Sequence, residues 1–291
     1  MPLDRRPIRI VTDSAADLPA DIVGRLEITV VPLLISVGQE TFADQQLSSH
    51  EFWRRVHGAF WPKTSQPPIG AFIQAFERLT EQGYDVICVT FTAAHSGTFN
   101  SAWSAASRFG DRVTVVDSRS ISLAEGWQVL RAAKLALQGA SRDDILAAIA
   151  SLRDRTRIYV QLDSLEAMRR GGRAALLMPT IDRVMRALDI KPILNVVEGQ
   201  LRLLGMARSS AKGLARIASE MATLGPLEMV QVMHFGAEQA AQHLAHQLAN
   251  ATHIALERIG VGEVGQVLAC HGGLGVIGVG GLLAPQPEDR L

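Results

Sequence analysis

The sequence is short of cysteine, of net charge and of aromatic residues. Its two cysteines, Cys88 and Cys270, are too few for a disulfide framework. The 29 basic and 29 acidic side chains cancel, which argues against a nucleic-acid groove because such grooves need a basic excess on one face. Phe, Trp and Tyr make up only 5% of the residues, so an aliphatic core is expected. A small ligand or a protein partner is the better expectation for this chain.

Signals for export or membrane insertion are also scarce. No basic-then-apolar leader opens the chain, because a strand is predicted from about Ile8, and the simple interpretation is a cytoplasmic protein. The 21 residues 264–284 contain no Asp, Glu, Lys or Arg. Seven glycines, with Gln266 and His271, make them a poor lipid-facing helix. Glycine-rich strands and turns near a ligand are expected there instead.

What the chain does have is an ordinary globular composition, 47% apolar and 20% charged, over 291 residues. Its first half alternates β-rich runs with amphipathic segments. Strands are expected at 8–11, 28–35, 85–90 and 113–116. Helices are expected after a capping box at 48–51, and at 69–79, 98–109, 121–138 and 143–153, the last opened by a second box at 141–144. This alternation predicts a mostly parallel sheet with helices on both faces.

The rhythm changes after about residue 159. A strand at 158–162 is followed by a hairpin around Glu198-Gly199-Gln200. Helices at 210–223 and 238–249 then bracket a strand at 229–235. We therefore place a boundary near 160, giving an N-terminal α/β domain at 1–160 and a C-terminal α/β domain at 161–291. No flexible linker is visible, so a cleft between closely packed domains is the expected ligand site.

Two hydroxyl clusters stand where helices are predicted to begin. Thr64-Ser65-Gln66 precedes the helix that starts near Pro68, and Ser96-Gly97-Thr98 follows a predicted strand. In a parallel sheet such loops line the edge where ligands bind. Hydroxyls, unpaired N–H groups and the positive end of a helix dipole together make an uncharged anion site. The alternative is that these residues only cap their helices.

Asp13-Ser14 also follows a predicted strand at this edge. A phosphatase that uses an aspartyl nucleophile would want a second Asp two residues on, but Ala15 stands there. The alternative for Asp13 is a turn-forming or helix-capping side chain.

Four catalytic, cofactor or metal patterns lack part of the context that they need. The sequence around Ser96 lacks both glycines of a hydrolase elbow, although a Ser–His pair with His271 remains open. In an extended run the side chains of Cys270 and His271 point to opposite faces, so they cannot pair with each other. The G-x-G-x-x-G at 273–278 lies too near the chain end for a dinucleotide site. His243, His246 and His253 favour a solvated helix face over a metal site.

An ordered set of short motifs resembles the DegV family, whose members include the fatty-acid-binding subunits of bacterial fatty-acid kinase. The motifs run from Thr12 to Pro19, Thr64 to Pro67, Ser96 to Ala102, Leu165 to Arg173 and Ile190 to Leu194. The resemblance implies a two-domain α/β fold with the acyl chain in a tunnel between the domains. The bound ligand would be a long-chain fatty acid, such as a C16–C18 acid, with no other cofactor.

The resemblance also implies roles at the carboxylate. Thr64 or Ser65, together with Ser96, would donate hydroxyl hydrogen bonds, and the Gly97 and Thr98 amides would support them. His271 falls at the family's His-Thr-Gly-Pro-Gly motif and would join the head-group network, although the sequence here is His-Gly-Gly-Leu-Gly.

Arg173, Arg208 and Asp13 would belong to the head-group network or to a partner-docking face. The implied partner is a separate kinase that phosphorylates the presented carboxyl with ATP, giving an acyl-phosphate for phospholipid synthesis. No P-loop or kinase signature is present, so the chain itself is expected to be a carrier without turnover.

Transient contact with a membrane surface is compatible with this role. Two alternatives stay open: an esterase or thioesterase that uses Ser96 with His271, and a lipid sensor or store without a kinase.

Overall fold

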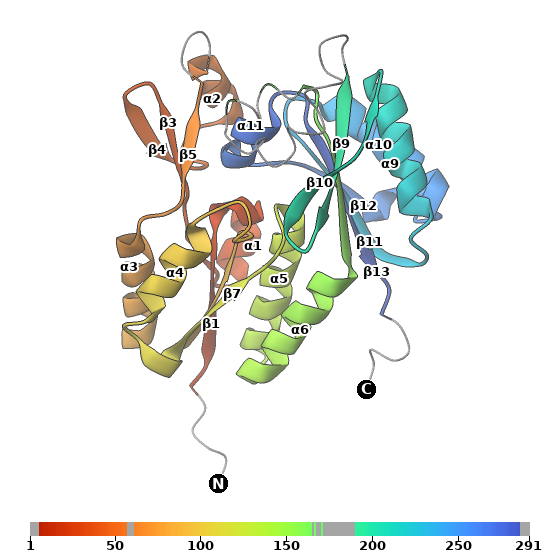
Figure 1. Ribbon diagram of the computed structural model, residues 1–291. Helices are drawn as coiled ribbons and strands as arrows, with labels where there is room; N and C mark the ends of the chain where they lie inside the picture. The colour runs from red at the N-terminus through yellow and green to blue at the C-terminus, as the bar shows by residue number, and fades with distance from the viewer. Residues whose placement is uncertain (1–5, 57–60, 165, 167–169, 171–189, 286–291) are drawn as a thin grey trace. The chain divides into compact units, whose positions relative to one another are not determined.

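The computed structural model describes residues 6–56, 61–164, 166, 170 and 190–285 (Figure 1). The chain forms two compact units, and the first comprises residues 1–48 and 64–154. The second comprises residues 49–63 and 155–291. The chain therefore passes from one unit to the other after Ser48, after Lys63 and after Asp154.

The first unit is built on a four-stranded parallel sheet with the order β2-β1-β6-β7. The strands are β1 (Ile8–Asp13), β2 (Thr29–Val31), β6 (Asp85–Thr90) and β7 (Val113–Asp117). β6 lies at the positions predicted from its β-branched run. The single strand predicted at 28–35 is wrong: it splits into β2 and β3 (Leu34–Val37), and Pro32 between them has no N–H for a sheet ladder.

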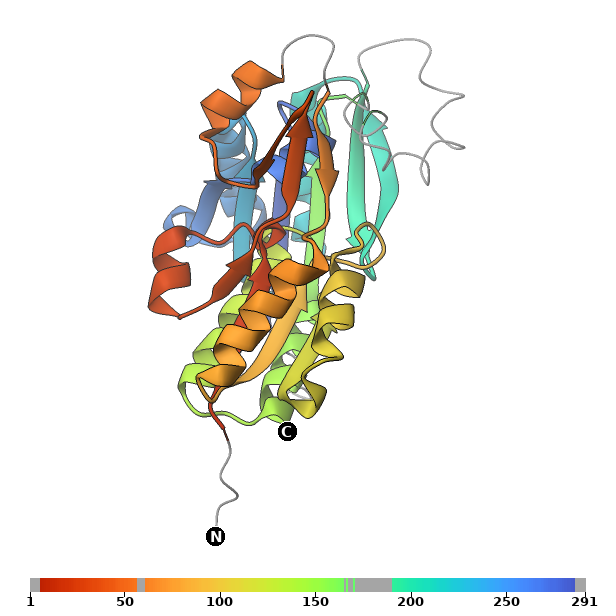
Figure 2. The ribbon, with the colours of Figure 1, turned by 90° about the vertical axis from the view of Figure 1, so that its left-hand side faces the viewer.

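Helices cover both faces of this sheet, as predicted. Alternate residues along each strand face opposite sides, so Ile10 and Ile87 point into one core while Val11 and Cys88 point into the other. The first core is completed by α1 (Ala20–Arg25), α5 (Leu123–Leu137) and α6 (Arg142–Arg155). The second is completed by α3 (Ile69–Glu81) and α4 (Thr98–Ala106), which lie side by side in Figure 2.

A small three-stranded sheet, which the sequence did not predict, has the order β4-β3-β5. Its members beside β3 are β4 (Glu40–Ala43) and β5 (Lys63–Ser65). The β3–β4 pair is an antiparallel hairpin whose turn includes Gly38 at φ 63°. β5 carries Thr64 and Ser65 and leads directly toward α3.

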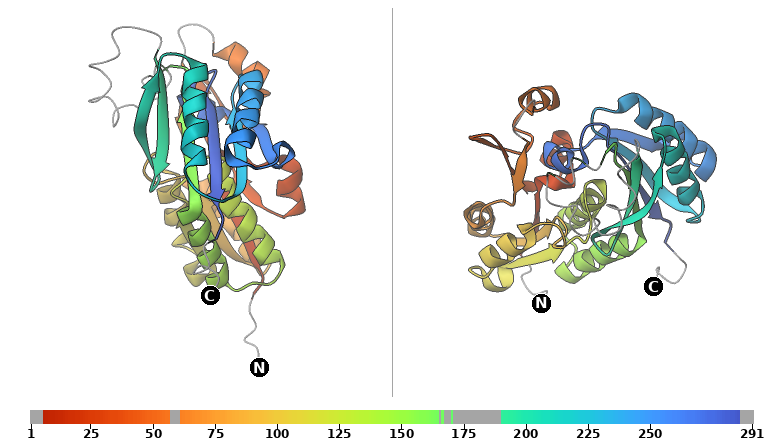
Figure 3. Two further views of the ribbon diagram at one scale, coloured as in Figure 1. Left: turned by 90° about the vertical axis from the view of Figure 1, so that its right-hand side faces the viewer. Right: turned by 45° about the horizontal axis from the view of Figure 1, so that its top comes forward.

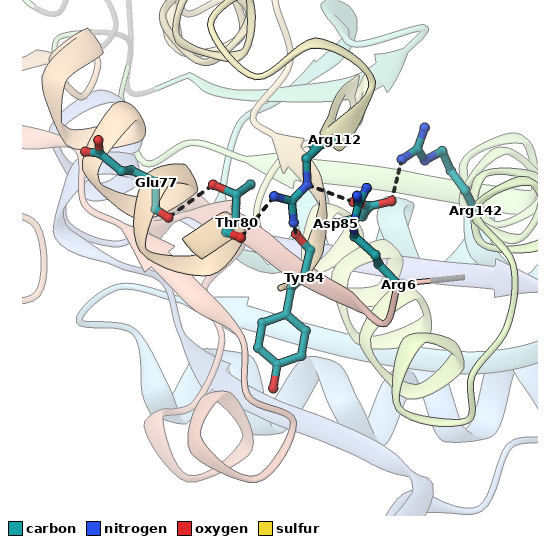
Figure 4. A network of polar contacts seen from close by, with 7 residues as sticks. All are labelled: Arg6, Glu77, Thr80, Tyr84, Asp85, Arg112 and Arg142. Carbon is teal, nitrogen blue, oxygen red and sulfur yellow. Dashed lines mark hydrogen bonds and ion pairs between the residues drawn. The ribbon is translucent and has the colours of Figure 1, made fainter. Parts of the chain in front are cut away.

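An ion-pair network lies at the amino end of β6, opposite the end where ligands usually bind (Figure 4). The Asp85 carboxylate contacts Arg112 Nε at 3.3 Å, Arg142 Nη2 at 3.1 Å and Arg6 Nη1 at 3.8 Å. Arg112 also donates to the carbonyl oxygens of Thr80 and Tyr84. The network ties the loop after α3 to the start of β7 and to α6.

The second unit is built on a six-stranded mixed sheet with the order β10-β9-β8-β13-β11-β12. The strands are β8 (Thr156–Gln161), β9 (Lys191–Val197), β10 (Gln200–Ala207), β11 (Leu227–His234), β12 (Ile259–Glu263) and β13 (Ile277–Leu283). One face is covered by α9 (Ser210–Ala222) and α10 (Glu238–Thr252) (Figure 3). The predicted hairpin at Glu198-Gly199 is confirmed, and both residues have the positive φ that a tight turn of type I′ requires.

The glycine-rich stretch 264–284 only partly matches its prediction. It supplies β13, but residues Gln266–Gly272 form a short helix, α11, where strands and turns were expected. Within the described ranges, none of the helices has both the length and the apolar character needed to cross a membrane.

The helix α2 (Ser49–Arg55) belongs to the second unit although it comes early in the chain. Its Phe52 and Trp53 rings lie 6.2 and 5.6 Å from the ring of Phe235, measured between centroids, in edge-on geometry. Ser49 Oγ donates to Glu263 Oε2 at 3.1 Å. These contacts fix α2 beside the ends of β11 and β12.

Candidate functional site

The carboxyl ends of β1, β6 and β7 gather the polar residues of the first unit. Asp13 and Asp117 are the last residues of β1 and β7, and Thr90 is the last residue of β6, the strand between them. Ligands of open α/β sheets bind at this edge, so it is the natural place for a site.

The Ser96-Gly97-Thr98 segment forms the start of α4. Thr98 is the first helical residue, and Gly97 in the preceding position offers no capping side chain. Ser96, one residue earlier, accepts from Thr98 N through its Oγ at 3.2 Å. The Ser96 and Thr98 hydroxyl oxygens lie 2.8 Å apart, so one donates to the other. Ser96 thus satisfies one amide of the first turn, although the N-cap position of α4 is Gly97.

Besides this local hydrogen bond, the segment can still donate hydrogen bonds to a ligand. When one hydroxyl of the pair donates to the other, the second proton is left to donate elsewhere. The first turn of α4 also directs N–H groups and the positive end of the helix dipole toward the same place. Ser96 is half-buried and Thr98 is buried, so hydrogen bonds made here are partly shielded from water.

The second hydroxyl segment lies next to the first. The side-chain amide of Gln66 packs so closely on Gly97 that a Cβ built there would meet its Cδ and Nε2 at 3.0 Å. Only glycine fits this contact without displacing Gln66. The structure therefore brings Gln66 of the first segment against Gly97 of the second, while Thr64 is half-buried and Ser65 exposed on β5.

Asp13 is fully buried, and its carboxylate serves the backbone. Oδ1 accepts from Ala15 N at 3.0 Å, which makes Asp13 the cap of a short 3-10 helix, η1 (Ser14–Ala16), so its capping alternative is confirmed. Oδ2 accepts from Phe91 N at 2.7 Å. Burial raises the pKa of Asp13 to about 7 even though both amides oppose the shift, and the nearby charge of Asp44 adds to it.

Glu125 is a second buried acid at this edge, and it was not predicted from the sequence. Its Oε1 accepts from Thr12 Oγ1 at 3.2 Å, while its Oε2 has no hydrogen-bond partner. Burial, and then the charge of Asp13, raise the pKa of Glu125 well above its usual value. A signal existed, because Glu125 shares helical spacing with Val129, Ala132 and Ala136, which face the core.

Three further predicted site residues fall in the stretch 155–291 of the sequence. His271 is half-buried on α11, so the interpretation of 270 and 271 as an extended run is wrong. Neighbouring residues on a helix do not face each other either, so Cys270 and His271 still cannot pair. Arg208 is exposed between β10 and Ser209, which caps α9. Arg173 lies outside the described residues.

The described ranges hold no group of three or more His, Cys, Asp and Glu side chains arranged for a metal ion. His243 and His246 are exposed on α10, which matches the prediction of a solvated helix face.

Comparison with known proteins gives a consistent result over nearly the whole chain. The profile described as "Uncharacterised protein, DegV family" matches residues 7–283. A DegV domain-containing protein of Staphylococcus aureus is 31% identical over 274 residues, covering 93% of this chain and 96% of the relative. A fatty-acid-binding DegV family protein from Thermus thermophilus is 30% identical, with a TM-score of 0.87, and the match covers 96% of this chain and all of that one. DegV of Bacillus subtilis, described as a fatty acid binding protein, is 29% identical with a TM-score of 0.82 and the same coverage. The chain belongs to the DegV family.

Proposed function

We propose that this protein binds a long-chain fatty acid and holds its carboxylate at the start of α4. The observation that carries the proposal is the meeting of two hydroxyl segments, with Gln66 packed on Gly97 and the Ser96 and Thr98 hydroxyls 2.8 Å apart. Two solved relatives, 30% and 29% identical to this chain, are described as binding fatty acids.

The chemistry of the segment suits a carboxylate. Thr64 or Ser65 and Ser96 would donate through hydroxyls, and the Gly97 amide at the helix start would add an N–H group and a favourable dipole. The Thr98 amide, which already donates to Ser96 Oγ, would support this geometry. Hydrogen bonds to a charged group contribute about 1.5–3 kcal/mol each. Burying a chain of ~16 carbons at ~0.8 kcal/mol per CH₂ offers on the order of 10 kcal/mol before association costs.

The finer roles rest on the family resemblance. His271 would join the head-group network, and Arg173 and Arg208 would serve that network or a docking face. The carrier would present the carboxyl to a separate kinase in the cytoplasm, which forms an acyl-phosphate for phospholipid synthesis. In this role the chain binds and orients the substrate and has no turnover of its own.

Mass spectrometry of ligand released from purified, denatured protein tests the central claim. A near-stoichiometric C16–C18 acid is expected. Ser96→Ala should retain less acid, whereas Ser104→Ala, an exposed serine on the same helix, should retain as much as the wild type. Absence of lipid, together with acyl-ester hydrolysis that Ser96→Ala abolishes, would establish the esterase alternative instead.

A second experiment tests the kinase partnership. The loaded protein is mixed with a bacterial fatty-acid kinase subunit and ATP, and acyl-phosphate is trapped with hydroxylamine. Formation of the hydroxamate supports the carrier role. Bound acid without any hydroxamate would favour a sensor or store.

A further inference from the structure

The loop between β6 and α4, residues 91–97, positions Ser96. Its C-terminal end, at Ser96 and Gly97, carries the proposed carboxylate site, while its first three backbone amides all donate to neighbouring segments. Phe91 N donates to Asp13 Oδ2 at 2.7 Å, and Ala93 N donates to Asp117 Oδ1 at 3.2 Å. Between them, Thr92 N donates to the Ser120 carbonyl at 3.2 Å.

The two aspartates occupy equivalent places in the sheet. Asp13 ends β1 and Asp117 ends β7, and these are the strands on either side of β6. The loop that leaves β6 is therefore held from both sides by a carboxylate at a strand end. Backbone amides in this loop are fixed by side chains that are distant in sequence.

We propose that Asp13 and Asp117 are positioning residues that hold the 91–97 loop in the geometry that binds a carboxylate. The inference rests on the proposed function. It assigns neither residue a contact with the ligand: Asp13 has no exposed surface, and both of its oxygens already accept backbone N–H groups.

The two carboxylates differ in a way that makes the proposal testable. Asp13 uses separate oxygens for Ala15 N and Phe91 N, so asparagine, which has one acceptor oxygen, cannot satisfy both. Asp117 takes Ala93 N at 3.2 Å and Arg119 N at 2.8 Å on the same oxygen, Oδ1. Asparagine at 117 can keep both bonds, whereas alanine keeps neither.

The test measures the affinity of each variant for hexadecanoic acid by titration calorimetry, with thermal unfolding as a check on folding. We expect Asp13→Asn and Asp117→Ala each to weaken binding about tenfold, and Asp117→Asn to bind as the wild type does. Asp111→Asn, at an exposed position of the same unit, is the charge-matched control.

A double-mutant cycle with Ser96→Ala separates positioning from general loosening of the fold. If the aspartates act through the loop, adding Asp13→Asn or Asp117→Ala to Ser96→Ala should cost much less than it costs the wild type. Losses that multiply in full would overturn the proposal. If Asp13→Asn does not fold, the Asp117→Ala cycle decides alone.

The outcomes also distinguish this inference from the proposed function. Wild-type protein that does not bind the acid, or Ser96→Ala that binds normally, would refute the carboxylate site itself. Weakened binding in Ser96→Ala, with Asp13→Asn and Asp117→Ala both normal, would refute only the positioning role.

Discussion

The two ends of the four-stranded sheet place their acidic side chains in different surroundings. At the amino end, Asp85 is partly exposed and contacts three arginines. At the carboxyl end, Asp13 and Glu125 are fully buried; Asp13 accepts two backbone amides, and Glu125 accepts one hydroxyl. The first arrangement suits stability, because opposite charges meet. The second costs free energy, because burial disfavours the charged form of both acids.

The largest expected difference between the two ends is in pH dependence. The pKa of Asp13 is raised from 3.8 to about 7, so the native state keeps a proton that the unfolded chain loses. The free energy of unfolding should therefore be highest below pH 4 for this group and fall as pH rises through 7, by up to about 4 kcal/mol. Urea unfolding between pH 4 and pH 8 measures this slope. A stability that rises steadily over that range would contradict the burial of an uncompensated acid.

Glu125→Gln isolates the second acid. Glutamine mimics the protonated form and keeps the acceptor for Thr12, so the variant should lose the part of the slope that begins at about pH 4.5. We expect it to match the wild type near pH 4 and to be more stable at pH 8. A variant less stable than the wild type at pH 8 would show that Glu125 is ionised and paired.

Ser96→Ala and Thr64→Ala probe ligand binding at the carboxyl end. Each should weaken the binding of a long-chain acid by about 1–2 kcal/mol through a lost hydrogen bond to a charge. Displacement of a fluorescent fatty acid measures the change, with Ser104→Ala as the control. Unchanged affinity in both variants would refute the head-group assignment.

Asp85→Asn probes the amino end. Removing the shared anion leaves three arginines near one another, and we expect a loss of about 1 kcal/mol of stability because the partners are partly exposed. The loss should change with salt concentration, since screening weakens both the attraction and the repulsion. Fatty-acid affinity should not change. A large change would show that the Asp85 network influences ligand binding at the carboxyl end of the sheet.

Arg208→Ala should have the smallest effect on binding. The side chain is exposed, so its loss should spare the affinity for the acid and reduce acyl-phosphate formation with a kinase. Weakened binding with normal transfer would remove the docking role.

Much of the fold could be predicted because its signals are local. The β-branched run at 85–90 became β6, and the capping box at Ser141 and Asp144 forms both of its backbone bonds, each at 3.2 Å. Two local signals failed. Pro32 divides a run that looks continuous, and α11, with seven residues, is too short to show a helical period.

The site was harder to predict. Ser96 and Thr98 could be found because they follow a strand and open a helix. The bond from Phe91 to Asp13 spans 78 positions of the chain, and such a contact leaves no local pattern. The raised pKa of Glu125 depends on how completely the side chain is buried, which only the packed structure reveals.

The membership of α2 in the second unit limits how the chain can be divided. A fragment that starts at Arg155 contains all six strands of the larger sheet, yet it lacks Phe52 and Trp53, which cover the Phe235 ring. We expect such a truncation to aggregate on expression, and a version that carries 49–63 fused through a linker to stay monodisperse by size-exclusion chromatography. A single cut after Asp154 therefore separates α2 from the rest of the second unit's core, whichever fragment is kept.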